Sequence, residues 1–312
     1  MYINIYLILL ILIIFIIFKF VINYFNENFT NISEFNIIFF SPNDLKNKKI
    51  NKKLYKILNN YLKNVSEYEI FFKTGKNIKR SNLANFYIDN ILNFTKEEKI
   101  FLDKNIRYIN DYCSKYNKII NDWRFIKISN KIDKGMPFTV DKYIFLCDEL
   151  LNNFDKNKIN KEFIDTLIHE KIHIIQRFDQ KKFNEFYKNN LNILYNNDLF
   201  ITEYWKKKHL KNPDGLDINW IYKYNNSYYL PLLIFQNNNV EQVIIKLNKK
   251  LQTTKDFINI RKFPLFNNIP YNVSPYHPNE LAAYILPKII LKNDSLPRNL
   301  KDKYYKLLDY LK

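Results

Sequence analysis

Hydrophobic and polar positions follow a helical pattern in the first part of the chain. Residues 2–18 carry no charged side chain, and about 20 apolar residues are enough to cross a bilayer as a helix. From Ser41 to Leu62 and from Thr95 to Cys113, apolar residues recur every three or four positions behind helix-capping sequences, which predicts amphipathic helices. We therefore expect a transmembrane anchor over residues 1–25 and a helical region over residues 26–120.

After residue 120 the spacing changes to alternation. Trp123 to Ile128 and Thr139 to Leu146 alternate apolar and polar side chains, which predicts two strands. Residues 218–235 favour a hairpin that turns at Asn225-Asn226, because asparagine tolerates the left-handed backbone of tight turns. Helices are predicted over residues 161–177, near 280–285 and over 301–311. Residues 121–312 therefore form the predicted second domain, and the fold class is α+β.

The net charge is less informative than its size suggests. The chain has 49 Lys and Arg against 31 Asp and Glu, a formal charge of +18. Lysine, asparagine, isoleucine, tyrosine and phenylalanine dominate while glycine, alanine and arginine are scarce, a composition that resembles AT-rich giant-virus proteins. A basic surface favours acidic partners in general. We expect no specific nucleic-acid partner, because no Arg-rich cluster or zinc finger is present.

Two scarce residue types exclude whole classes of site. Three glycines, Gly75, Gly135 and Gly215, cannot build a glycine-rich loop that cradles phosphate groups. The two cysteines, Cys113 and Cys147, form no C-x-x-C pair, so a thiolate metal site is excluded. We interpret them as small buried hydrophobic residues, with a disulfide as the alternative.

The candidate chemistry lies in residues 169–173, His-Glu-Lys-Ile-His. On a helix, positions i and i+4 share a face, so His169 and His173 can bind one metal ion. Zinc at such a site lowers the pKa of a bound water, and Glu170 lies beside it to accept the proton as general base. The motif falls within an apolar-periodic helix, which favours this interpretation over a structural pair of histidines.

On these residues the chain resembles the zincin metallopeptidases of the gluzincin type, in which a glutamate from a later helix is the third zinc ligand. The best candidate is Glu280 in His277-Pro-Asn-Glu-Leu-Ala-Ala-Tyr284, which resembles the H-P-x-E-x-x-A pattern of many zincin-like proteins. Ala282 and Ala283 would let its helix approach the first one closely. The alternative third ligand is Glu203 in Ile-Thr-Glu-Tyr-Trp.

The resemblance also implies an architecture around the metal. It implies a small mixed sheet packed on the active-site helix, with an edge strand, Thr139 to Leu146, that binds extended peptide. Residues 136–139 would then lie at the mouth of the cleft. Tyr284 is the preferred donor to the developing oxyanion, with Tyr276 and His277 as alternatives.

Two further polar side chains, Gln176 and His209, lie outside the proposed ligand set. Gln176 either contacts a ligand or satisfies polar groups in the core. We expect His209, which follows three lysines, on the solvated surface.

The sequence therefore predicts a membrane-anchored zinc metallopeptidase. His169, His173 and Glu280 would bind Zn²⁺, while Glu170 and Tyr284 would be catalytic. The expected partners are a peptide or protein substrate and, through the N-terminal helix, a lipid bilayer of a virion or of host endomembranes. The alternatives are a catalytically inactive zincin-fold structural or binding protein, and a basic protein that binds lipid or nucleic acid.

Overall fold

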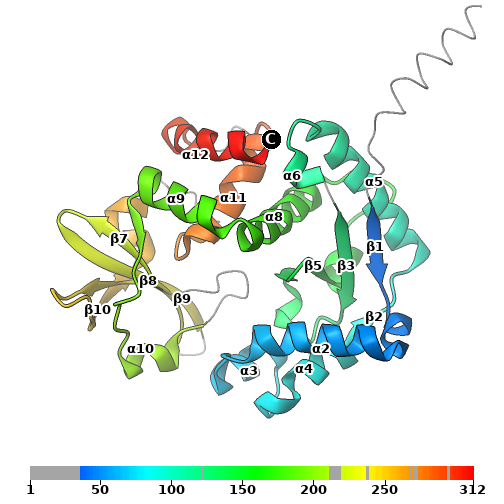
Figure 1. The fold of residues 1–312 in the computed structure, drawn as a ribbon, viewed down its shortest axis with the longest axis horizontal. Coiled ribbons are helices and arrows are strands. Elements are labelled where there is room, and N and C mark those ends of the chain that lie inside the picture. The colour runs from blue at the N-terminus through cyan, green and yellow to red at the C-terminus, as the bar shows by residue number, and fades with distance from the viewer. Residues whose placement is uncertain are drawn as a thin grey trace, which may run out of the picture. The chain divides into compact units, whose positions relative to one another are not determined.

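The computed structural model describes residues 36–120, 122–210, 219–236, 239–266, 269, 273–293 and 296–312. Residues 37–312 form one compact unit. Within the described residues, this unit is α+β and contains two five-stranded sheets, here called sheet A and sheet B (Figure 1). The domain boundary expected near residue 120 falls inside the unit, where β1 (Ile37–Phe40) pairs with β3 (Trp123–Ile128).

The predicted transmembrane anchor requires a correction. Residues 1–25 lie outside the described residues. In the part of the chain that the structure does describe, no helix is both long and apolar enough to cross a bilayer. Its helix α8 (Lys161–Phe178), for example, is 18 residues long but carries charged groups such as Asp165 and Glu170. The transmembrane helix of the predicted fold class and the predicted single-pass membrane localisation therefore find no support in this structure.

Sheet A is mixed and is built around β3. Strands β1, β3 and β5 (Tyr143–Cys147) run parallel. The edge strand β4 (Phe138–Val140) is antiparallel to β5, and the short β2 (Ile91–Leu92) is antiparallel to β3. Five of the six residues of β3 are buried, because helices cover this central strand.

The prediction of a single strand from Thr139 to Leu146 is wrong. The chain turns at Asp141, whose backbone has a φ of 54°, so β4 and β5 form a hairpin. Aspartate adopts this left-handed conformation more readily than most residues do. The alternating pattern of residues 139–146 continues through the turn and therefore conceals it. The edge strand of sheet A is consequently only three residues long.

Helices from the first part of the chain cover sheet A. The sequence pattern at Ser41 predicts the start of a long helix, but Ser41 and Asp44 cap a short 3-10 helix instead. Asn47 then caps α2 by accepting from the backbone of Lys49 and Ile50. The capping box at Thr95 and Glu98 is present as predicted. The helices are η1 (Pro42–Lys46), α2 (Lys48–Leu62), α3 (Glu67–Thr74), α4 (Arg80–Asp89), α5 (Lys96–Tyr112) and α6 (Asn117–Ile120), followed later by η2 (Asp133–Gly135) and α7 (Asp148–Asn152).

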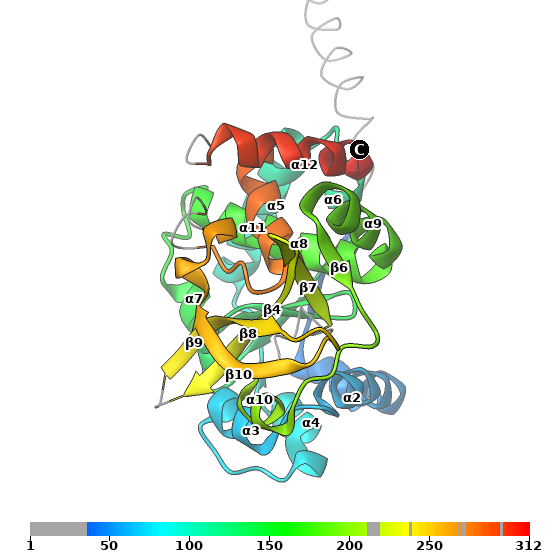
Figure 2. The same cartoon turned by 90° about the vertical axis from the view of Figure 1, so that its left-hand side faces the viewer.

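Sheet B is an antiparallel sheet in the order β10-β9-β8-β7-β6 (Figure 2). The predicted turn at Asn225 and Asn226 is confirmed, since both have positive φ and join β7 to β8. Trp205 of α10 (Glu203–Lys208) is buried against one face with residues such as Leu232 and Val243. The strands are β6 (Ile193–Tyr195), β7 (Trp220–Tyr224), β8 (Ser227–Gln236), β9 (Asn239–Leu247) and β10 (Thr253–Asn259).

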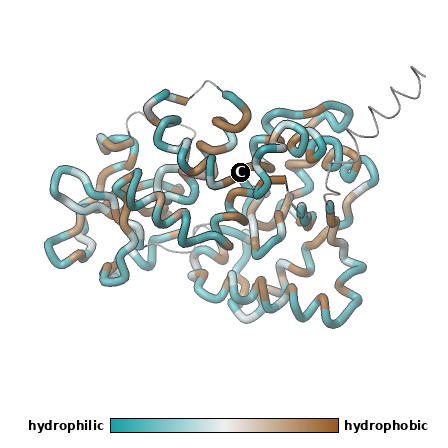
Figure 3. Tube along the Cα trace, turned by 45° about the horizontal axis from the view of Figure 1, so that its top comes forward, coloured by the Kyte–Doolittle hydropathy of each residue, from teal (hydrophilic) through white to brown (hydrophobic). Residues whose placement is uncertain are grey.

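The helices that complete the unit include α11 (Pro278–Ile290), which together with α8 carries the candidate site. Helix α11 packs against α8, and its Ala282 and Ala283 are fully buried, which permits a close approach of the two backbones. Brown and teal positions alternate along the helices in Figure 3, as expected of helices with one buried face. The remaining helices are α9 (Gln180–Leu191), η3 (Ile260–Lys262), η4 (Pro264–Phe266), α11 (Pro278–Ile290) and α12 (Arg298–Leu311).

Candidate metal centre

Helix α8 brings the two motif histidines to one face. Asn160 caps the helix by accepting from the backbone N–H of Phe163 at 2.9 Å. One turn separates His169 from His173, and their ring centroids are 4.6 Å apart. Their Nε2 atoms lie 3.0 Å from each other. Both imidazoles therefore present the same ring nitrogen to a common point, as the i and i+4 spacing predicts.

Glu280 reaches the same point from the first turn of α11. Its Oε1 lies 3.4 Å from Nε2 of His173, and its Oε2 lies 3.8 Å from Nε2 of His169. Three ligands placed tetrahedrally at zinc distances of 2.0–2.2 Å are about 3.3 Å apart. The Nε2–Nε2 separation is 3.0 Å, and the separations of 3.4 and 3.8 Å end on the two different oxygens of Glu280. One donor atom from each residue lies within 4.8 Å of the other two, so the three residues together could hold one metal ion.

Glu203, the alternative third ligand, lies elsewhere. It occupies the first turn of α10, where 74% of its side chain is exposed. Its carboxylate pairs with Nζ of Lys206 at 2.8 Å, and this ammonium group lowers the pKa of Glu203. The structure thus brings Glu280, and not Glu203, to the two histidines.

Burial sets the protonation of His173. The side chain of His173 is 1% exposed, whereas that of His169 is 24% exposed. Desolvation lowers the pKa of His173 to about 3, so its imidazole is neutral near pH 7. The neutral ring is the form that binds a metal.

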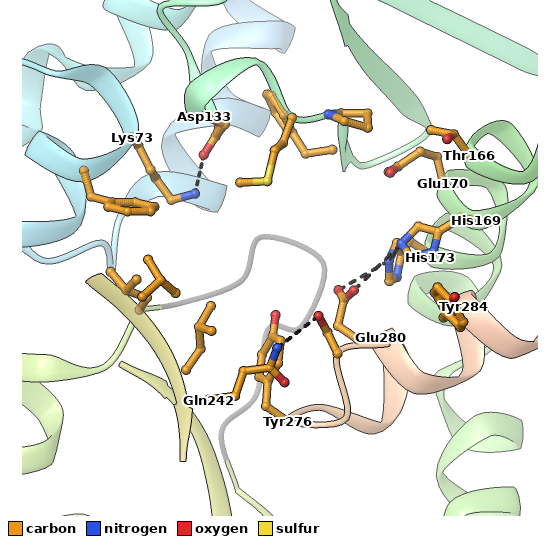
Figure 4. Close-up of a pocket in the computed structure, with 18 of the residues that line it drawn as sticks. Lys73, Asp133, Thr166, His169, Glu170, His173, Gln242, Tyr276, Glu280 and Tyr284 are labelled. Carbon is orange, nitrogen blue, oxygen red and sulfur yellow. Dashed lines mark hydrogen bonds and ion pairs between the residues drawn. The ribbon is translucent and has the colours of Figure 1, made fainter. Parts of the chain in front are cut away.

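The three residues form part of the wall of a cavity of about 550 Å³ (Figure 4). Glu170, Tyr276 and Tyr284 line the same cavity. Glu170 is only 3% exposed, and Figure 4 shows its carboxylate beside His169, facing the cavity. The general-base candidate and the three metal-ligand candidates therefore face one cavity.

Of the three candidate oxyanion donors, two lie at the cavity and one does not. Tyr284 follows Glu280 by one turn, and Nζ of Lys288 lies 4.5 Å from its ring centroid. Tyr276 precedes α11 and also lines the cavity. His277 instead begins α11, where its Nδ1 accepts from the backbone of Asn279 at 3.1 Å and its ring packs edge-on against Trp220.

Part of the cavity wall was not expected from the sequence. Lys73 of α3 forms a buried ion pair with Asp133, and Figure 4 shows the pair across the cavity from His169. Asp133 also accepts from the hydroxyl of Tyr87 at 2.9 Å. Lys73 and Asp133 lie in segments without a motif, so no sequence signal marks them.

Helix α8 forms hydrogen bonds with the edge strand β4 and with the turn that follows it. The guanidinium of Arg177 donates to the backbone oxygens of Asp141 and Thr139 at 2.8 and 3.2 Å, and to the Thr139 hydroxyl at 2.9 Å. Met136 and Pro137, just before β4, line the cavity. Backbone pairing with an extended peptide would therefore have to use the part of the edge before Thr139.

The prediction that His209 lies on the solvated surface is wrong. This residue is 6% exposed and forms an isolated bridge with Ile234 of β8. Lys206 and Lys207 are exposed, as the three lysines suggest. The chain that follows α10 turns back onto sheet B, where the backbone N–H of Leu210 donates to the oxygen of Leu233 at 2.8 Å. His209 contributes no atom to the group formed by His169, His173 and Glu280.

The chain matches no known family model, no curated protein and no solved structure. The resemblance to the zincins thus rests on the motif residues and on the geometry that they adopt.

Proposed function

We propose that this chain is a zinc-dependent peptidase. The observation that supports this most strongly is the cluster of donor atoms from His169, His173 and Glu280. The two Nε2 atoms lie 3.0 Å apart, and Oε1 and Oε2 of Glu280 lie 3.4 Å from His173 and 3.8 Å from His169, at the wall of a cavity that Glu170 also lines. Two imidazoles and one carboxylate are a ligand set of catalytic zinc sites, which leave a fourth position open.

The donor set fits zinc better than the hard cations. Calcium and magnesium prefer oxygen ligands in sixfold or higher coordination, whereas two of the three donor atoms here are imidazole nitrogens. The partial exposure of His169, at 24% of its side chain, leaves the site open toward the cavity. The carboxylate also brings one negative charge to a partly buried site, which favours binding of a divalent cation.

In the proposed reaction the protein provides the proton transfers and the binding surface. A bound zinc ion supplies Lewis acidity and lowers the pKa of a water that it binds. The carboxylate of Glu170 accepts the proton of the attacking water and then donates it to the leaving amine. The hydroxyl of Tyr284 donates to the oxygen of the attacked carbonyl as negative charge develops there.

The cavity wall supports a peptide as substrate. Its apolar part includes Phe72, Met136 and Phe138, and its polar part includes Gln242. A volume of about 550 Å³ accommodates a few side chains rather than a folded protein surface. A flexible or extended segment of a polypeptide fits these dimensions.

The test compares zinc content with peptide cleavage. Wild-type protein is expected to bind one zinc ion per chain and to cleave a mixed peptide library, with cleavage inhibited by a chelator. Glu170→Gln should retain zinc and lose most of the activity, by a factor of roughly 100 or more. Glu162→Gln, an exposed change in the first turn of the same helix, is the matched control and should keep full activity.

The result also separates peptidase from the other candidates. A stoichiometric zinc ion without any cleavage would identify a zinc-binding scaffold. Equal cleavage by wild type and Glu170→Gln would exclude Glu170 as the general base. A protein that binds no zinc would exclude both zinc-dependent functions.

A further inference from the structure

Gln176 lies between the second and the third metal-ligand candidates. It follows His173 by three residues on α8 and is 2% exposed. Its Oε1 lies 2.8 Å from Nδ1 of His173. Its Nε2 lies 2.9 Å from the backbone oxygen of Asn279, the residue before Glu280. One amide side chain therefore contacts the ring of one ligand and the backbone next to another.

The contact with Asn279 fixes the orientation of the Gln176 amide. A backbone carbonyl oxygen can only accept a hydrogen bond, so the atom of Gln176 that faces it must be the NH₂ group. The amide oxygen then faces His173. Because an amide oxygen can only accept, Nδ1 of His173 must carry the ring proton. The neutral ring has one proton, so Nε2 keeps its lone pair and directs it toward His169 and Glu280.

A third contact agrees with this assignment. The second N–H of Gln176 donates to the hydroxyl oxygen of Tyr187 at 3.2 Å. Tyr187 in turn donates to Oδ1 of Asn279 at 2.8 Å, and it is buried in α9. The donors of His173, Gln176 and Tyr187 in this group thus each face an acceptor. The contacts join α8, α9 and α11 at the level of the metal-ligand candidates.

We propose that Gln176 is a positioning residue that holds His173 in its metal-binding tautomer and fixes the first turn of α11, and so Glu280, against α8. The role in metal binding rests on the proposed function. The tautomer of His173 is a property of the metal-free protein and can be measured independently. The sequence left Gln176 open between contacting a ligand and satisfying core polarity. The geometry points to a role in orienting a metal ligand, since outer hydrogen bonds of this kind commonly set the tautomer and basicity of metal-binding histidines.

The first test reads the tautomer directly. The chain has four histidines, so ¹⁵N-histidine labelling of the full-length protein gives few signals, and replacing each histidine in turn assigns them. Long-range ¹H–¹⁵N correlation in the presence of a chelator should show the His173 proton on Nδ1. A proton on Nε2 would overturn the proposal, and this measurement requires no change at Gln176.

The second test uses variants at position 176. Gln176→Met removes every hydrogen bond of the amide and should weaken zinc binding roughly 10- to 100-fold, in the range typical of outer-shell contacts, with a mixture of His173 tautomers. Gln176→Glu keeps an acceptor for His173 but loses the donors, and should keep the tautomer and recover part of the zinc affinity. Gln180→Met, at the exposed start of α9, is the matched control.

The outcomes separate this proposal from the proposed function. Zinc affinity and tautomer that are unchanged in Gln176→Met would overturn the positioning role. Gln176→Met and Gln176→Glu could also lose zinc affinity equally while the His173 tautomer stays unchanged. That result would make Gln176 a packing residue and would also contradict the proposal. A wild-type protein that binds no zinc yet carries the His173 proton on Nδ1 would refute the metal site and leave the hydrogen-bond assignment standing.

Discussion

The Nε2 atom of His173 lies 3.4 Å from Oε1 of Glu280, although sheet B separates their helices in the chain. If Nδ1 of His173 carries the ring proton, both atoms are acceptors. Two facing acceptors repel each other unless a cation or a proton lies between them. The fold thus brings together groups whose repulsion a bound metal ion would relieve.

We expect zinc to stabilise the protein through these groups. At a free zinc concentration 100 times the dissociation constant, the free energy of unfolding should rise by about 2.7 kcal/mol. Thermal unfolding followed with and without zinc measures this gain. Glu280→Gln should abolish most of the zinc-dependent shift, whereas Glu203→Gln, which alters an exposed residue of α10, should leave the shift unchanged. The opposite pattern would make Glu203 the third ligand.

The buried ion pair between Lys73 and Asp133 should be important for stability. Their side chains are 9% and 5% exposed, and Lys73→Met would leave the carboxylate of Asp133 buried without its cation. Such a change costs about 3–5 kcal/mol. Urea denaturation of Lys73→Met, Asp133→Asn and the double variant measures the coupling, and the double variant should lose less than the sum of the single losses.

The exposed pair of Lys206 and Glu203 provides the comparison for that experiment. Half of the Lys206 side chain is exposed, so solvent screens its interaction with Glu203. Lys206→Met should cause no measurable loss of stability. Equal losses for Lys73→Met and Lys206→Met would show that burial of the Lys73–Asp133 pair has no energetic consequence.

Lys171, the third residue of the His-Glu-Lys-Ile-His motif, should make stability dependent on pH. Its Nζ is buried, donates to the backbone oxygen of Asp122 at 2.8 Å and lies 5.0 Å from the Trp123 ring centroid. Desolvation lowers its pKa to about 8 from the ordinary 10.5. Between pH 8 and 10.5 the unfolded chain therefore binds more protons at this residue than the folded chain does, and stability rises with pH.

The variant Lys171→Met tests this dependence. A shift of this size opposes folding by about 3 kcal/mol below pH 8, and the lost hydrogen bond and cation–π contact offset roughly 2 kcal/mol. We expect the variant to be more stable than wild type by ~1 kcal/mol at pH 7, with the difference vanishing or reversing as pH rises to 10.5. Chemical denaturation at several pH values measures both. A difference that is independent of pH would contradict the assignment.

Both cysteines should be unreactive in the folded protein. Cys113 and Cys147 are buried free thiols, and burial raises the pKa of Cys113 to about 12 and also raises that of Cys147. The thiolate is the reactive form, so a thiol reagent at pH 8 should label neither residue until denaturant is added, and then both. Rapid labelling of the native protein would contradict this burial.

The candidate site was more predictable than the fold around it. Helix α8 could be located because its apolar positions keep a helical period through the motif, and Asn225-Asn226 marked its hairpin by backbone chemistry. The β4–β5 hairpin was missed because the turn at Asp141 carries the polar and apolar alternation of a strand. Lys73 and Asp133 could not be anticipated, since their pairing depends on how α3 packs near η2.

Gln176 illustrates a second reason why a role cannot be predicted from the sequence. Its place on the same helix face as His173 was evident, but its role depends on the backbone oxygen of Asn279, 103 residues away. Sequence spacing specifies contacts within one helix, whereas the contact with α11 is set by the packing of two helices. Glu280, the proposed third ligand, could be selected from the sequence because a local motif surrounds it.

The order of the elements has a consequence for biosynthesis. His169 and His173 leave the ribosome well before Glu280, because α9, α10 and all of sheet B are encoded between them. A nascent chain that ends before α11 holds two imidazoles but lacks the carboxylate, and two ligands bind zinc more weakly than three. Metal uptake, and any hydrolysis that depends on it, should therefore begin only after α11 has docked on α8, which would protect neighbouring nascent chains from a premature active site.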